Sequence, residues 1–194
     1  MSQPIRLIVG LGNPRSKYDQ TRHNAGFWFL DAVCRALNVQ MASDKRLGGS
    51  LGRVRMGDTE LRLFEPATFM NESGLPVGRV VRYYQIPPEQ VLVAYDELDL
   101  DAGVARLKFD GGHGGHNGMR DVISHLGTRQ FWRLRIGIGH PGAANKVVNY
   151  VLSKPSVDDR VGIERVIDDS VDQLQLLLDG QQEKAMQRLH TVKN

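Results

Sequence analysis

The run IRLIVGL at residues 5–11, followed by GNP at 12–14, decides the fold class of this chain. Its aliphatic and β-branched residues predict a short buried strand, and the Gly-Asn-Pro sequence predicts the turn that ends it. From about Thr21 the apolar spacing becomes helical. The residues on that helical face are Phe27, Leu30, Cys34 and Leu37. A strand followed by a helix is the unit from which α/β folds are built.

Further strands and helices alternate along the rest of the chain. Strands are predicted at 52–56 and 60–64, as a hairpin around Gly57-Asp58, and at 91–95, 104–109 and 131–138. Helices are predicted after Pro66, over 119–126, over the apolar stripe that runs from Ile163 to Leu178, and over 183–192. We therefore expect a single α/β domain over residues 1–194. Its sheet should be mixed, mostly parallel and twisted, with helices on both faces and the helices from about 156 packed on it.

The composition is that of an ordinary globular protein, with 41% hydrophobic and 24% charged residues among 194. The lone Cys34 excludes an intramolecular disulfide and a zinc site with two thiolates. Its helical position predicts a buried small hydrophobe rather than a nucleophile. No apolar run approaches the roughly 20 residues that span a bilayer, and residues 1–4 show no leader pattern, so a cytoplasmic protein is expected.

The basic excess lies in the main body of the chain. Residues 1–155 hold 20 basic and 14 acidic residues, a net charge of +6, whereas residues 156–194 hold 5 and 8, a net charge of −3. This distribution is compatible with a polyanionic partner such as nucleic acid.

Polar residues follow the ends of the predicted strands. Asn13, Glu65 and Asp96 end three of them, and Met70-Asn71 comes shortly after the second. The other polar candidates are Arg22, His23 and Asn24 at the start of a helix, and His113, His116 and Asn117 in the loop GGHGGHNG at 111–118. Because ligands of open α/β sheets bind beyond the carboxyl ends of the strands, we expect one pocket to hold these side chains.

Several kinds of site fit these residues. Gly10 and Gly12 suggest dinucleotide binding, but Arg15 stands where the third glycine belongs. His113 and His116 could bind a metal with Asp96 or His140, although a glycine loop lacks the rigid spacing of helical ligands. No nucleophile elbow is present. A histidine, an acid and several amides suit the activation of water for ester hydrolysis.

Six runs in the chain resemble the motifs of bacterial peptidyl-tRNA hydrolases, in the same order and spacing over nearly its whole length. They are LIVGLGNP (7–14), TRHNAG (21–26), PATFMNESG (66–74), DELDL (96–100), GGHGGHNG (111–118) and RLRIGIGHPG (133–142).

The resemblance implies a monomeric, cytoplasmic, metal-independent enzyme without a cofactor. Such an enzyme cleaves the ester between a peptide and the 3′-terminal ribose of tRNA, and so recycles tRNA from peptidyl-tRNA released by stalled ribosomes. Its partner is peptidyl-tRNA, contacted at the acceptor stem and the 3′ end, and no membrane is involved.

The resemblance also implies roles for individual residues. His23 would be the catalytic base, Asp96 the acid that orients it, and Asn13 a third catalytic residue beside the water and ester. The substrate-binding residues would be Tyr18 at the tRNA 3′ end, Met70, Asn71, His116 and Asn117. Lys108 and Arg135 match the basic pair that holds the tRNA 5′-phosphate in this family.

The charge state of His23 decides whether it can accept a proton. The start of a helix and the neighbouring Arg22 disfavour imidazolium, whereas Asp96 favours it and sets the tautomer. Two rival classes stay open: a non-catalytic RNA-binding relative of the same fold, and a metal-dependent hydrolase that uses His113, His116 and Asp96.

Overall fold

Seven strands form one mixed sheet in the computed structural model, which describes residues 2–191. The strands are β1 (Leu7–Gly10), β2 (Ala42–Asp44), β3 (Gly49–Met56), β4 (Thr59–Pro66), β5 (Val91–Glu97), β6 (Ala105–Phe109) and β7 (Trp132–Gly137). Their order across the sheet is β2-β3-β4-β1-β5-β7-β6. The apolar runs at 5–11 and 91–95 thus lie side by side at the centre, as β1 and β5.

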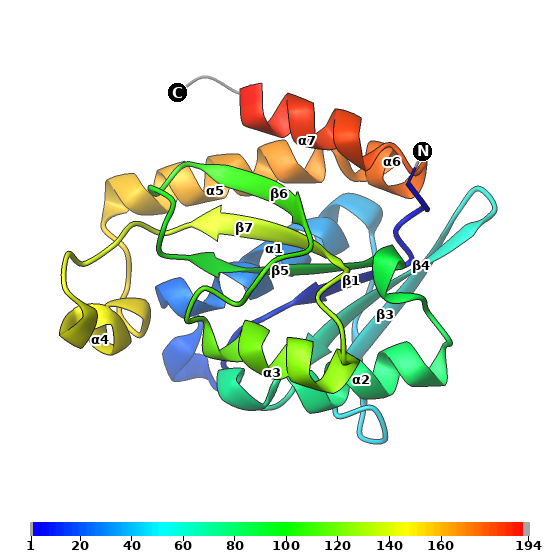
Figure 1. The fold of residues 1–194 in the computed structure, drawn as a ribbon, viewed down its shortest axis with the longest axis horizontal. Helices are drawn as coiled ribbons and strands as arrows, with labels where there is room; N and C mark the ends of the chain where they lie inside the picture. Colours follow the sequence, from blue (N-terminus) through cyan, green and yellow to red (C-terminus); the bar gives the residue numbers. More distant parts are fainter. Residues whose placement is uncertain (1, 192–194) are drawn as a thin grey trace.

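Parallel pairing is confined to the four central strands. β4, β1, β5 and β7 run in one direction, so their carboxyl ends meet at one edge of the sheet (Figure 1). β2 and β3 pair antiparallel beyond β4, and β6 pairs antiparallel with β7 at the other border. The expected mixed sheet is therefore confirmed, with its antiparallel strands at the two borders.

Helices cover both faces of the sheet, as the alternation of strands and helices predicted. The helices are α1 (Ala25–Leu37), α2 (Gly74–Tyr83), α3 (Asn117–Leu126), α4 (Val147–Val151), α5 (Val157–Val171), α6 (Leu174–Leu178) and α7 (Gln182–Thr191). One apolar core lies between the sheet and α1, α5, α6 and α7, and the other between the sheet and α2 and α3 (Figure 1). Within residues 2–191 no helix is long and apolar enough to cross a membrane.

The apolar stripe beyond Pro155 forms two helices rather than the single long one predicted. α5 ends at Val171, and α6 begins at Leu174. Near this break the hydroxyl of Ser170 donates to the carbonyl of Val166 at 2.6 Å, a local bond that bends helices. Leu177 in α6 then accepts from the backbone N–H of Ile5, which attaches the α6 turn to the chain just before β1.

Two glycines bring α1 close to the centre of the sheet. A Cβ on Gly10 would lie 2.5 Å from the carbonyl oxygen of Gly26, and a Cβ on Gly26 would overlap the carbonyl oxygen of Ala94. No larger residue fits at either position without displacing backbone. The close approach places the segment before α1, which contains His23, beside the end of β5, which contains Asp96.

Candidate active site

His23 and Asp96 form the centre of the site. His23 lies in a short 3-10 helix, η2 (Arg22–Asn24), directly before α1, and Asp96 lies near the carboxyl end of β5. Nδ1 of His23 lies 2.8 Å from Oδ2 of Asp96 and 3.0 Å from Oδ1. Because an ionised carboxylate only accepts hydrogen bonds, Nδ1 carries the proton, and Nε2 keeps its lone pair. The His23 side chain is 13% exposed, so solvent and small groups can reach it.

A second histidine bonds the same carboxylate. Nε2 of His116 lies 2.8 Å from Oδ1 of Asp96. The other ring nitrogen of His116, Nδ1, accepts the backbone N–H of Met119 at 3.2 Å and caps the start of α3. His116 is therefore held as the neutral tautomer protonated on Nε2, and both of its nitrogens are engaged.

These contacts set the charges at the centre. Burial alone would raise the pKa of Asp96, but the two histidines outweigh it and hold that pKa well below its usual range. Burial lowers the pKa of His23, yet the charge and hydrogen bond of Asp96 outweigh burial, and the net pKa is raised. With Asp96 only 2% exposed, its charge is little screened by solvent.

Arg22 has a different role from the one expected beside His23. Its guanidinium bonds the carbonyl oxygens of Tyr150, Ser153 and Lys154 and lies 3.9 Å from the centre of the Tyr150 ring. The guanidinium thus attaches the segment after α4 to η2. The pKa of His23 is raised rather than lowered because Asp96, and not Arg22, is its dominant charged neighbour.

Asn13 is held by its neighbours at the end of β1. The side chain of Asn24 accepts from the backbone N–H of Asn13 at 2.8 Å and donates to the Asn13 carbonyl at 3.0 Å. Oδ1 of Asn13 accepts the backbone N–H of Met70 at 2.7 Å. With Oδ1 engaged in this way, the amide Nδ2 is the part of Asn13 left to donate to a ligand.

The remaining substrate-binding candidates lie on a short helix after β4, on α3 and in the segment before η2. Met70 and Asn71 lie in the 3-10 helix η3 (Met70–Glu72), with Met70 buried and Asn71 exposed. Asn117 is the exposed first residue of α3, and its Oδ1 accepts from Arg120 at 3.1 Å. Tyr18 packs edge-on against Phe69, the residue before Met70, with ring centres 6.4 Å apart. Glu65, a further strand-end residue, lies instead near Asp31 and Asp19.

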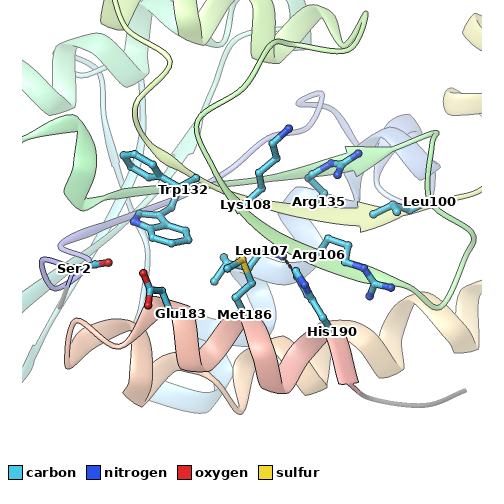
Figure 2. A pocket seen from close by; sticks show the side chains of 11 residues that line it. Ser2, Leu100, Arg106, Leu107, Lys108, Trp132, Arg135, Glu183, Met186 and His190 are labelled. Carbon is cyan, nitrogen blue, oxygen red and sulfur yellow. Dashed lines mark hydrogen bonds between the residues drawn. The ribbon is translucent and has the colours of Figure 1, made fainter.

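Lys108 and Arg135 are assembled apart from the histidines, on the antiparallel pair β6 and β7. Both line a cavity of about 620 Å³ between these strands and α7, which contains none of the residues around His23 (Figure 2). In Figure 2 their side chains extend together away from α7, whereas Arg106 turns toward His190. Glu97 accepts from Nε of Arg135 at 2.7 Å, which leaves the two terminal nitrogens of Arg135 for an anion.

The group His23, Asp96 and His116 also has the residue types of a metal site, since one ligand atom from each lies within 4.8 Å of the others. His113, a ligand only in the rival metal-dependent interpretation, does not belong to that group, and its Nδ1 accepts from Gly115. The tautomer of His116 opposes metal binding. Nε2 must lose its proton to become a ligand, whereas the N–H of Met119 already occupies the lone pair of Nδ1.

Sequence reasoning placed Asn24 among the pocket candidates without a role, and it did not anticipate the part played by Glu97 or the buried position of Arg133. Asn24 follows His23 and Glu97 follows Asp96, so each lies within a motif that was already singled out. Their residue types gave no sign of their partners, because the partners come from distant parts of the chain.

Comparisons with known proteins agree on one family. The model of the family "Peptidyl-tRNA hydrolase" matches residues 7–194. The chain is 50% identical over 189 residues to the peptidyl-tRNA hydrolase of Nitrosospira multiformis, covering 97% of this chain and 99% of that one. It is 52% identical over 189 residues to that of Stenotrophomonas maltophilia strain R551-3, with coverages of 97% and 98%.

A solved structure shows the same fold. The crystal structure of peptidyl-tRNA hydrolase from Acinetobacter baumannii superimposes with a TM-score of 0.96 at 44% identity, covering 100% of this chain and 98% of that one. Fold and sequence together define an ester hydrolase of α/β architecture. The chain belongs to the peptidyl-tRNA hydrolase family, and peptidyl-tRNA hydrolysis is its activity.

Proposed function

We propose that the enzyme hydrolyses peptidyl-tRNA with His23 as the general base. In this mechanism Asp96 orients the imidazole ring of His23. Nε2 of His23 takes a proton from water, and the hydroxide formed attacks the ester carbonyl carbon. When the tetrahedral intermediate collapses, the ribose oxygen leaves and receives the proton from Nε2. The products are a peptide carboxylic acid and tRNA with a free terminal hydroxyl, and His23 returns to its starting state.

The asparagine side chains supply uncharged donors and acceptors around this reaction. Nδ2 of Asn13, whose Oδ1 is engaged by Met70, is placed to donate to the water or to the developing oxyanion. Asn71 and Asn117 are exposed, and their amides suit a peptide backbone, which also has both donors and acceptors. Met70 provides an apolar wall, and Tyr18 a surface for the tRNA 3′ end.

The tRNA body binds on β6 and β7 in this proposal. Lys108 offers a point charge and Arg135 a planar fork, a combination that suits the 5′-phosphate of the acceptor stem. The enzyme acts as a cytoplasmic monomer without a metal, and it returns tRNA from stalled ribosomes to translation.

One observation carries the mechanism: Nδ1 of His23 donates to Asp96 at 2.8 Å, which leaves a basic nitrogen on a partly exposed ring. The test is turnover of N-acetyl-aminoacyl-tRNA in excess EDTA. Full activity supports metal-free catalysis. Loss of activity that Zn²⁺ restores would favour a metal at His23, Asp96 and His116, and no turnover under any condition would favour a non-catalytic RNA-binding relative.

A further inference from the structure

The guanidinium of Arg133 is buried against the glycine loop. Arg133 lies in the middle of β7 and is only 1% exposed, although it borders a cavity of about 310 Å³ together with Lys108, Arg135 and the glycine loop. Its two terminal nitrogens donate to the backbone carbonyl oxygens of Gly111 and Gly112, and one of them also reaches the carbonyl of Arg129 at 3.4 Å. The guanidinium carbon lies 4.7 Å from the centre of the Phe131 ring.

These contacts anchor one end of a loop that has few means of holding its own shape. Gly111, Gly114 and Gly115 all have positive φ angles, a backbone conformation that is costly for residues with a Cβ. Apart from the contacts with Arg133, loop residues 111–115 form only short-range hydrogen bonds among the described residues: Gly111 with the Asp110 side chain, and His113 with Gly115 and His116. At the far end, His116 bonds Asp96, and Asn117 begins α3.

A direct contact of Arg133 with tRNA does not fit this geometry. A side chain that is 1% exposed cannot meet a phosphate without leaving the carbonyl oxygens of Gly111 and Gly112. No carboxylate forms a salt bridge with Arg133 in the part of the chain that the structure describes. Three backbone carbonyls, the Tyr95 side chain and the nearby charge of Asp110 offset part of the cost of burying its charge, and the pKa of Arg133 is lowered chiefly by that burial.

We infer that Arg133 is a positioning residue for catalysis: it fixes the start of the glycine loop so that His116 meets Asp96 and Asn117 faces the substrate. The inference rests on the roles proposed above for Asn117 and the His23–Asp96 pair, together with the hydrogen bond between His116 and Asp96. Loss of the anchor displaces groups near the reacting atoms, and misplacement of about 1 Å can cost about 10²-fold in rate.

The experiment compares Arg133→Gln with Arg53→Gln. Both variants lose one positive charge from a strand of the same sheet, but Arg53 is exposed in β3 and its side chain forms no hydrogen bond or salt bridge among the described residues. In Arg133→Gln, kcat is expected to fall about 10- to 100-fold with KM within about threefold, and the preference for a 5′-phosphate should persist. In Arg53→Gln, kcat should stay at the wild-type value.

Amide hydrogen exchange separates this role from a general loss of stability. In Arg133→Gln, protection should be lost at residues 111–118 and kept in α5. Arg133→Lys, which retains the charge and one donor group, should lie between Gln and wild type in both kcat and loop protection, and it serves as the test variant if the Gln variant does not fold.

Wild-type kcat in folded Arg133→Gln or Arg133→Lys would overturn the inference, as would loss of exchange protection spread evenly over the chain. Loop exchange is measured without substrate, so it tests the anchor even if the mechanism proposed for His23 fails. If the loop loosens while kcat is unchanged, the anchor exists but does not serve catalysis.

Discussion

His116 donates from Nε2 to Oδ1 of Asp96 over 2.8 Å, so the carboxylate that orients the proposed base is itself held by the glycine loop. Backbone N–H of Met119 fixes the tautomer that makes this bond possible. Because both ring nitrogens are engaged, we propose that His116 positions Asp96 rather than binding the peptide directly. The two roles differ in their kinetic consequences.

The first prediction follows from that assignment. His116→Ala should lower kcat about tenfold and change KM less than about threefold, because the Asp96 carboxylate loses one of the two histidine donors that fix its orientation. Steady-state kinetics on N-acetyl-aminoacyl-tRNA measures both constants. The control is His140→Ala, since His140 lies outside the glycine loop and bonds Gly142. A raised KM with unchanged kcat would instead restore His116 to substrate binding.

The pH dependence of kcat reports the coupling of His23 to Asp96. The pKa of His23 is raised by Asp96, so in the wild type the acidic limb should lie above the pH at which an ordinary histidine titrates. Asp96→Asn removes the charge that favours imidazolium, while burial continues to disfavour it. The limb should therefore move to lower pH, and kcat should fall less than in His23→Ala. A limb that does not move would show that the two side chains are not coupled.

Lys108→Ala and Arg135→Ala should raise KM with little change in kcat, because binding at a remote phosphate is similar in the ground and transition states. Each variant should also lose most of its preference for substrates with a 5′-phosphate and show a shallower salt dependence. Glu97→Gln, which removes the partner of Nε in Arg135, should give a weaker version of the same effect. Undiminished phosphate preference in both alanine variants would place the phosphate site elsewhere.

Stability should depend on pH through Glu65. Burial raises its pKa from 4.5 to about 7, and the charges of Asp31 and Asp19 add to the effect. A raised carboxyl pKa means that the folded state favours the protonated form; this stabilisation is present below about pH 4.5 and is lost as the pH rises through about 7.

Glu65→Gln removes that pH dependence. The difference in unfolding free energy between variant and wild type should be about 1–2 kcal/mol more favourable to the variant at pH 8 than at pH 4.5. This figure allows for the partial exposure of the Glu65 side chain. Urea unfolding at the two pH values measures the difference, and Glu72→Gln, a change at an exposed carboxylate, is the control. The prediction would be contradicted if the free energies of unfolding of wild type and Glu65→Gln changed equally between the two pH values.

Much of this architecture could be predicted because it depends on local patterns. The run at 5–11 became β1, the hairpin around Gly57-Asp58 became β3 and β4, and the strand that ends near Asp96 became β5. Asn13 and Asp96 lie at the carboxyl ends of β1 and β5, where the ligands of a parallel sheet bind.

The features that escaped prediction depend on contacts between distant segments. Alternation along RLRIG shows which residues share a face of β7, but not that the carbonyls of Gly111 and Gly112 bury Arg133 while Arg135 stays accessible. The stripe from Ile163 to Leu178 has a continuous helical period, and the break before α6 is visible only in the fold.

The measurement that tests the central claim most directly is the single-turnover rate of His23→Ala, made alongside its affinity for tRNA. The account predicts a rate about 10²- to 10⁴-fold below wild type, with affinity within about threefold, because a general base acts in the transition state and adds little to binding. His140→Ala, a change in a loop histidine that bonds Gly142, should match wild type in both. A His23→Ala enzyme that turned over peptidyl-tRNA at the wild-type rate would contradict the account.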